Sequence, residues 1–148
     1  MFLSIMKNQL LRHSLSTIGH RFQISIDQLD INIKDLSLGN NIRTPLQLVQ
    51  HINELLAVKS YLLINDQDKR NLFCSEDIKS ETARTFVLLK KLDSVLAEKK
   101  IPIEVQKKLI QGPFSDILTH IGQLLLLRRY YDQPAKSGNY ASTDIKTG

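Results

Sequence analysis

Four stretches of the chain carry apolar residues at steps of three and four, the spacing that places them on one face of an α-helix. The first stretch ends at about Leu29, and its apolar positions are Leu11, Leu15, Ile18, Phe22, Ile26 and Leu29. Gly19 lies inside this stretch and lowers helix propensity by about 1 kcal/mol relative to alanine. We therefore expect either a close helix contact at Gly19 or a weakened helix.

Two further helices are predicted by the residues at their starts. Thr44 has the side chain of an N-cap, and Pro45 suits the first helical position because its missing N–H would have no partner there. The polar segment 65–71 ends this second helix. Ser75 and the acidic pair that follows it predict the start of a third helix, which extends to about Glu98.

The fourth stretch predicts a short helical piece that begins at Pro102 and is broken at Gly112–Pro113. The last helix then extends to about Tyr131. Residues 132–148 are polar and aperiodic, which predicts a loose tail or an arm that packs on another surface. No segment alternates as a β-strand would, so we expect an all-α, up-down four-helix bundle in a single domain, residues 1–148.

Composition narrows the class of protein. No apolar run approaches the roughly 18 residues of a membrane span, and the first residues lack the apolar core of a signal peptide. Cys74 is the single cysteine, so an intrachain disulfide is impossible and a cytoplasmic location is expected. The net charge of +5 comes from scattered basic residues, which is typical of a solvated surface.

Three polar residues lie on or beside the apolar stripes. His51 falls inside or at the edge of the second stripe, and Asp116 and His120 are four residues apart on one face of the last helix. Inward side chains of facing helices can build a metal site inside a bundle, and two imidazoles with one carboxylate leave open positions on a divalent metal. Such a metal would activate a bound water or polarise a bound anion.

The same residues also have a purely structural explanation. A histidine on an apolar face is often a hydrogen-bonded core residue. Asp116 follows Gly112–Pro113 in the first turn of the predicted helix, where the helix dipole alone favours an acid. Spacing therefore leaves both explanations open.

Two segments resemble the DinB/YfiT-like superfamily of metal-binding four-helix-bundle proteins. GPFSDILTHIGQLLLLRR, residues 112–129, is similar to the family's last helix, and its Asp-x-x-x-His-x-Gly-Gln core is the most specific part. TPLQLVQHINELL, residues 44–56, is similar to the second helix, where a histidine supplies the first ligand. The polar tail with Asn139–Tyr140 resembles the arm found in one branch.

The resemblance implies that His51, Asp116 and His120 hold a divalent metal, which could be Zn, Ni, Fe or Mn. Asp116 departs from the family, where this position is commonly histidine, so the metal and the occupancy of the site stay open. The resemblance also implies a homodimer. It further implies a metal-dependent enzyme that acts on a small-molecule substrate, either a transferase with a low-molecular-weight thiol as co-substrate or a hydrolase.

Other polar residues have open roles. Glu54 is a candidate hydrogen-bond acceptor, base or fourth ligand, or an exposed helix residue, and Gln123 could bond to a ligand or lie at the surface. His13 and His20 fall off the first stripe and are expected to be exposed. Gly122 could allow close helix packing. An anion-binding role or a simple helix-dipole role is open to Arg128, Arg129, Tyr130 and Tyr131.

Two functions compete with the metal-dependent enzyme. The first is a non-catalytic helical protein that binds a small molecule or a partner and has an empty or degenerate metal site. The second is nucleic-acid binding, which the basic charge and the DNA-damage association of the family name suggest. It ranks last because the chain has no basic patch interleaved with aromatic residues.

Overall fold

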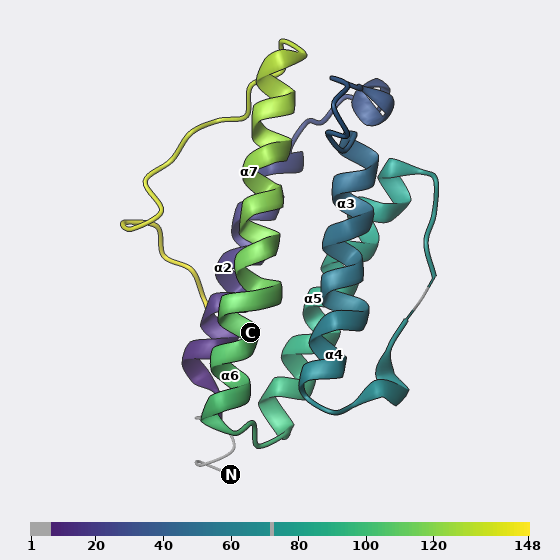
Figure 1. Ribbon diagram of the computed structural model, residues 1–148. Helices are drawn as coiled ribbons and strands as arrows, with labels where there is room; N and C mark the ends of the chain where they lie inside the picture. Colours follow the sequence, from purple (N-terminus) through teal and green to yellow (C-terminus); the bar gives the residue numbers. More distant parts are fainter. Residues whose placement is uncertain (1–6, 72) are drawn as a thin grey trace.

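The structure, a computed structural model, describes residues 7–71 and 73–148. Within these ranges it is all-helical, and four long helices form a bundle (Figure 1). The signal-peptide expectation concerns the start of the chain, of which residues 1–6 lie outside the described part. Among the described residues, no helix combines the length and the apolar character needed to cross a membrane.

Two of the four long helices are uninterrupted α-helices, and the other two each contain a π-turn. The uninterrupted ones are the first helix, α2 (Gln9–Ile26), and the third helix, α5 (Ile78–Glu98). The second and fourth are continuous helices in which one turn is a π-turn: α3 (Pro45–Glu54), η2 (Leu55–Lys59) and α4 (Ser60–Leu63), then α6 (Ile103–Leu109), η4 (Ile110–Phe114) and α7 (Ser115–Tyr130). Short 3₁₀ turns η1 (Ile31–Asp35) and η3 (Gln67–Lys69) lie in the connections.

The helix starts follow the capping residues. The Thr44 hydroxyl accepts from the Gln47 N–H at 3.2 Å, and the Gln47 side chain accepts from the Thr44 N–H at 2.9 Å, which completes a capping box. The predicted start of α3 is thus confirmed. The cap of α5 is Asp77, two residues beyond Ser75, because its carboxylate accepts from the Ser80 N–H at 3.0 Å.

The first helix is shorter than its apolar stripe. α2 ends at Ile26, and Gln28 adopts a left-handed conformation with a φ of 54°. The N–H of Leu29 then bonds to the carbonyl of Ile26 at 3.0 Å, which closes the turn. Leu29 therefore lies beyond the helix rather than at its last position.

The predicted break at Gly112–Pro113 is wrong, because the helix continues through it. Proline lacks an N–H and normally ends a helix interior. Here Pro113 lies in the π-turn η4, and the Ser115 hydroxyl donates to the carbonyl of Ile110 at 2.5 Å. Asp116 consequently lies in the middle of a long helix rather than near a helix start.

The helices α3 and α5 are parallel. Asn53 in α3 donates to Glu81 near the start of α5, with 2.8 Å between Nδ2 and Oε2. Lys99, just after α5, donates to the carbonyl of Ile64, just after α4, at 2.8 Å. The chain therefore has to return along the bundle between α4 and α5, and Figure 1 shows residues 65–71 and 73–77 of this connection.

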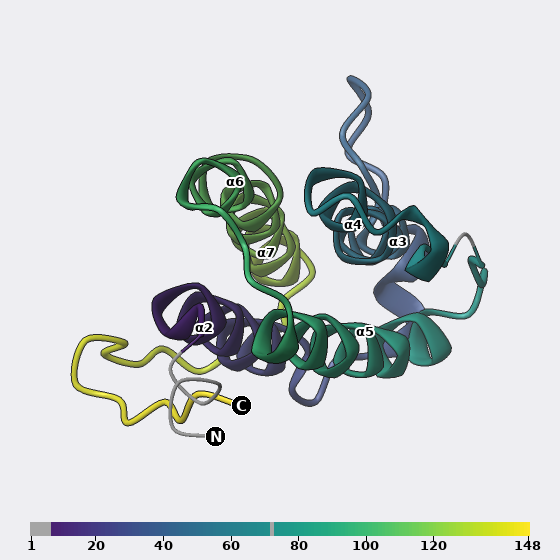
Figure 2. The ribbon, with the colours of Figure 1, turned by 90° about the horizontal axis from the view of Figure 1, so that it is seen from below.

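The helices α2 and α7 are also parallel. Gln106 in α6 donates to Asn8 at the start of α2 at 3.3 Å, and Arg128 near the end of α7 donates to the carbonyl of Ser25 at 2.9 Å. Seen along the bundle, α2 and α5 form one side, and the α6–α7 and α3–α4 helices lie above them (Figure 2). α2 and α3 each pack against α5 and α7.

The pair α2 and α5 is antiparallel. A bidentate ion pair joins Arg12 to Asp93, and the rings of Phe22 and Phe86 lie 5.4 Å apart towards the other end. The chain therefore passes up, down, down and up. The predicted helical bundle is confirmed, but the strictly alternating order is wrong, since the two middle helices point the same way.

The core lies where the four helices meet. Each helix supplies fully buried side chains, among them Phe22, Ile52, Leu92 and Leu124. The close contact expected at Gly19 is present, because a Cβ there would lie 3.4 Å from a methyl carbon of Leu89.

The C-terminal residues form an arm that packs on α2. The guanidinium of Arg21 lies 3.9 Å from the ring centroid of Tyr140, Thr147 bonds to the His13 ring at 2.9 Å, and the Gly148 N–H donates to Ser16. Figure 1 shows this yellow segment descending beside α2. Of the two predictions for residues 132–148, the packed arm is the one observed.

Candidate metal centre

The two predicted histidine ligands lie side by side. His51 comes from α3 and His120 from α7, and their ring centroids are 4.8 Å apart with the planes at 73°. His120 is buried, while about a quarter of the His51 side chain is exposed. The histidine pair therefore lies between α3 and α7, at the border between the core and the surface.

Each imidazole is held by an acceptor three residues further along its own helix. His51 Nδ1 lies 3.1 Å from Glu54 Oε2, and His120 Nδ1 lies 2.9 Å from Gln123 Oε1. A carboxylate or amide oxygen only accepts, so both Nδ1 atoms carry the hydrogen. Within the described ranges neither Nε2 has a hydrogen-bond partner, which leaves its lone pair available in the neutral ring.

Asp116 is close to this pair but does not complete it. Its side chain is exposed, and it lines a cavity of about 450 Å³ together with His51, Lys59 and Pro113. Among the residues that the structure describes, no three histidine, cysteine or acidic side chains are gathered closely enough to hold a metal. The three-ligand set thus stays a prediction. Two of its members, His51 and His120, are in contact.

The position of Asp116 removes one structural explanation for it. The helix-dipole explanation needs an acid in the first turn of a helix. Because α6, η4 and α7 are continuous, the first turn of this helix lies near Ile103, far from Asp116. The acid is therefore not accounted for by a helix start.

Both π-turns border the candidate site. η2 begins four residues after His51, η4 ends two residues before Asp116, and the two turns contact each other. A π-turn inside an α-helix is rare and is frequently found at functional sites. No signal in the sequence distinguished η2, whereas Pro113 marks η4.

A larger cavity opens on the other side of His51. Its volume is about 1160 Å³, and it is lined by residues of the loop 37–44, by α3 with η2, and by Asn71, Phe73 and Cys74. Arg84 of α5 also lines it. His51 and Glu54 are shared between this cavity and the metal centre, so the two features adjoin.

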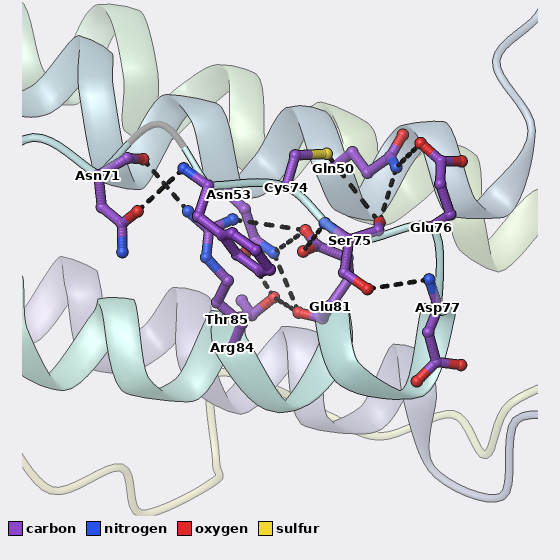
Figure 3. A network of polar contacts seen from close by, with 11 residues as sticks. Gln50, Asn53, Asn71, Cys74, Ser75, Glu76, Asp77, Glu81, Arg84 and Thr85 are labelled. Atoms are coloured by element: carbon purple, nitrogen blue, oxygen red, sulfur yellow. Dashed lines mark hydrogen bonds and ion pairs between the residues drawn. The ribbon is translucent and has the colours of Figure 1, made fainter.

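A buried polar network holds one wall of this cavity (Figure 3). Glu81 is fully buried and accepts from Asn53 at 2.8 Å and from the Ser75 N–H at 2.8 Å. A terminal nitrogen of Arg84 lies 3.5 Å from the same carboxylate, and the Asn71 N–H donates to the carbonyl of Ala57 in η2. These bonds fix Asn71 and Ser75 against η2 and α5.

The sequence did not point to the residues of this wall. Glu81, Arg84 and Asn53 are ordinary polar residues of helices, and only the parallel packing of α3 and α5 brings them together. No motif or spacing in the sequence predicts that contact.

Cys74 lies exposed at the cavity rim. Partial burial, with the negative charges of Glu81 and Glu76, raises the pKa of its thiol. The thiol form therefore predominates at neutral pH, which does not favour a nucleophilic role.

The other histidines and Gly122 take no part in the contact between His51 and His120. His13 is exposed as predicted, whereas His20 is half-buried, 6.2 Å from the Tyr140 ring. Gly122 is exposed with nothing near its Cβ position, so the predicted close packing there is wrong.

Arg128 has a structural role at the end of the bundle. It is buried, and it donates to the carbonyls of Ser25 and Gln133, each at 2.9 Å. Burial lowers the pKa of its guanidinium from the usual value. Of the suggested anion-binding group, Arg129 and Tyr130 are exposed and Tyr131 is half-buried.

The chain matches no protein-family model, no curated protein and no solved structure. The resemblance to the DinB/YfiT-like superfamily therefore stays a hypothesis that rests on residues 44–56 and 112–129.

Proposed function

We propose that this protein binds a divalent transition metal through the Nε2 atoms of His51 and His120. The observation that carries the proposal is the contact between the two imidazoles from facing helices, each anchored through Nδ1. A metal-ligating histidine typically donates its other N–H to a nearby oxygen, which fixes the tautomer and the ring orientation. Both rings have this arrangement.

Asp116 is the proposed third ligand. It lies one helical turn before His120 and shares a cavity with His51. Because its side chain is exposed, it can change rotamer to reach an ion without displacing core residues. Two imidazoles and a carboxylate would leave positions open for water or substrate.

The activity we propose is a metal-dependent reaction on a small molecule, of the thiol-transferase or hydrolase type. A metal in such a site lowers the pKa of bound water and supplies a nucleophile near neutral pH. The cavity beside His51 has room for a substrate. This proposal also agrees with the resemblance to the DinB/YfiT-like superfamily.

A second candidate is a binding protein without catalytic metal. The observation in its favour is that Asp116 is exposed and no three-ligand group is assembled in the described residues. It predicts that ligand binding in the large cavity survives removal of both histidines.

Metal content of protein purified without chelator, measured by elemental mass spectrometry, tests the proposal. We expect about one ion per chain after loading with Zn, Ni, Fe or Mn, and loss of that ion in His51→Ala and in His120→Ala. Asp116→Ala should weaken binding by a smaller factor.

The matched control is His13→Ala, which removes an exposed histidine that bonds to the arm. It should keep the metal. Two results would refute the metal proposal: both site variants retain the metal, or the folded wild type takes up none of the four ions. Either result would favour the second candidate, a binding protein without catalytic metal.

A further inference from the structure

We propose that the 1160 Å³ cavity beside His51 binds a small organic anion, whose carboxylate or phosphate group is held by Arg43 and Arg84. The inference names the substrate class of the proposed reaction and rests on the proposed function in that respect. Anion binding itself needs no metal, so the two proposals can fail separately.

The cavity has the size and the lining of a small-molecule site. Its volume of about 1160 Å³ lies slightly above the usual range for such sites, about 300–1,000 Å³. Amide and hydroxyl side chains line the cavity together with the two arginines, and they come from the loop before α3, from α3 and from the segment before α5: Asn40, Asn41, Thr44, Gln47, Gln50 and Asn71. Such groups donate to anionic oxygens and fix the orientation of a ligand.

Arg84 is held in place and retains donors. One terminal nitrogen donates to the carbonyl of Asn71 at 3.2 Å, and the other lies 3.5 Å from Glu81. Its Nε is buried and has no hydrogen-bond partner within the described residues. A guanidinium has five N–H donors, so this fixed side chain has capacity for a further acceptor.

The ring of Phe73 lies next to Arg84. The guanidinium carbon lies 5.8 Å from the ring centroid, and Phe73 itself is largely exposed and lines the cavity. A cation at this distance from an aromatic ring is attracted to it, which helps to hold the Arg84 guanidinium beside the cavity.

Arg43 supplies the second positive charge. It is exposed in the loop before α3 and makes no ion pair within the described ranges. The planar guanidinium matches the oxygens of carboxylate and phosphate. Among the lining side chains the two arginines outnumber the one carboxylate, Glu54, which already bonds to His51 and lies 3.8 Å from Lys59.

The cavity places the arginines and the histidine pair beside the same ligand. Arg43 lies just before α3, Arg84 lies in α5, and His51, which also lines the cavity, contacts His120. An anion held by the arginines would therefore share the cavity with His51. The substrate we expect carries an anionic group at one end and the reacting group at the other.

Calorimetric titration of metal-free protein with succinate and with inorganic phosphate tests the inference. We expect binding of at least one of the two, weakened at least about tenfold in Arg43→Gln and in Arg84→Gln, because each variant loses charge-assisted hydrogen bonds. The matched control is Arg129→Gln, which removes the same charge from an exposed position on α7.

The Arg43→Gln variant decides the outcome if Arg84→Gln does not fold, since among the described residues no hydrogen bond or ion pair joins the Arg43 side chain to the buried Glu81 network. A second measurement uses Cys74, which lines the cavity. A saturating anion should slow alkylation of Cys74 by iodoacetamide several-fold.

Two results would overturn the inference. One is failure of both anions to bind the folded wild type or to protect Cys74. The other is equal weakening in Arg43→Gln and Arg129→Gln, which would mean that net charge alone attracts anions. Metal uptake by Arg43→Gln is measured alongside and should be unchanged, so the metal proposal is judged independently.

Discussion

Glu54 and Gln123 occupy equivalent places relative to the two histidines. Each lies three residues after its histidine, and residues three apart on a helix are neighbours. Both roles had been left open in the sequence, since either side chain could have pointed to solvent alone. Their oxygens instead fix which nitrogen of each ring carries the hydrogen.

The acceptor at Gln123 should matter for metal affinity. In Gln123→Ala the Nδ1–H of His120 loses its partner at 2.9 Å, so the ring is free to change tautomer and orientation. Loss of such a partner typically weakens metal binding about 10–100-fold. Competition titration of Zn²⁺ with a chromophoric chelator measures the change.

The control for this prediction is Gln111→Ala, which changes an exposed glutamine on the same continuous helix. It should bind Zn²⁺ as the wild type does. An unchanged affinity in Gln123→Ala would mean that packing, rather than this hydrogen bond, holds His120.

At the scale of single elements, the apolar pattern located each long helix. Steps of three and four depend only on neighbouring residues, so they predict a helix whatever the tertiary packing. The pattern was less informative about helix continuity. Gly112–Pro113 has the composition of a break, yet the π-turn η4 absorbs the proline, because packing against α2 and η2 favours one long helix.

Gly19 in α2 and Gly122 in α7 allow a matched test of helix propensity. Gly122→Ala should raise the free energy of unfolding by about 1 kcal/mol, because nothing lies within 4 Å of its Cβ position. Gly19→Ala should gain less, since its Cβ would touch Leu89 at 3.4 Å. Chemical denaturation monitored by circular dichroism gives both values.

A larger gain at Gly19 than at Gly122 would contradict this packing. It would mean that α2 and α5 are separated further than the contact between Gly19 and Leu89 indicates.

At the scale of the whole molecule, Arg128 joins three parts of the chain. It lies near the end of α7 and donates to the carbonyl of Ser25 in α2 and to that of Gln133 at the start of the arm. Its side chain is buried, so these carbonyls would be left without a partner if it were removed.

Arg128→Met should therefore lower the free energy of unfolding by about 2–3 kcal/mol, the usual effect of losing charged hydrogen bonds in a buried setting. Urea denaturation measures it. Arg129→Met, at the exposed neighbouring position, should change stability little; an equal loss in both variants would assign the effect to charge near the helix end instead.

The sequence by itself determined the helical elements, the capping box at Thr44 and the apolar stripes, because these depend on residues within a few positions of one another. It also placed His51 and His120 on inward or border faces. It could not determine the parallel course of α3 and α5, because amphipathic helices can bury the same face in either direction.

Only the tertiary structure decided which polar residues meet. It brought the imidazoles of α3 and α7 to 4.8 Å, left Asp116 at the surface nearby, and joined Arg84 to the wall of a cavity that no motif announces. The physical reason is that helix pairing sets distances between residues far apart in the chain, and periodicity carries no information about which faces pair.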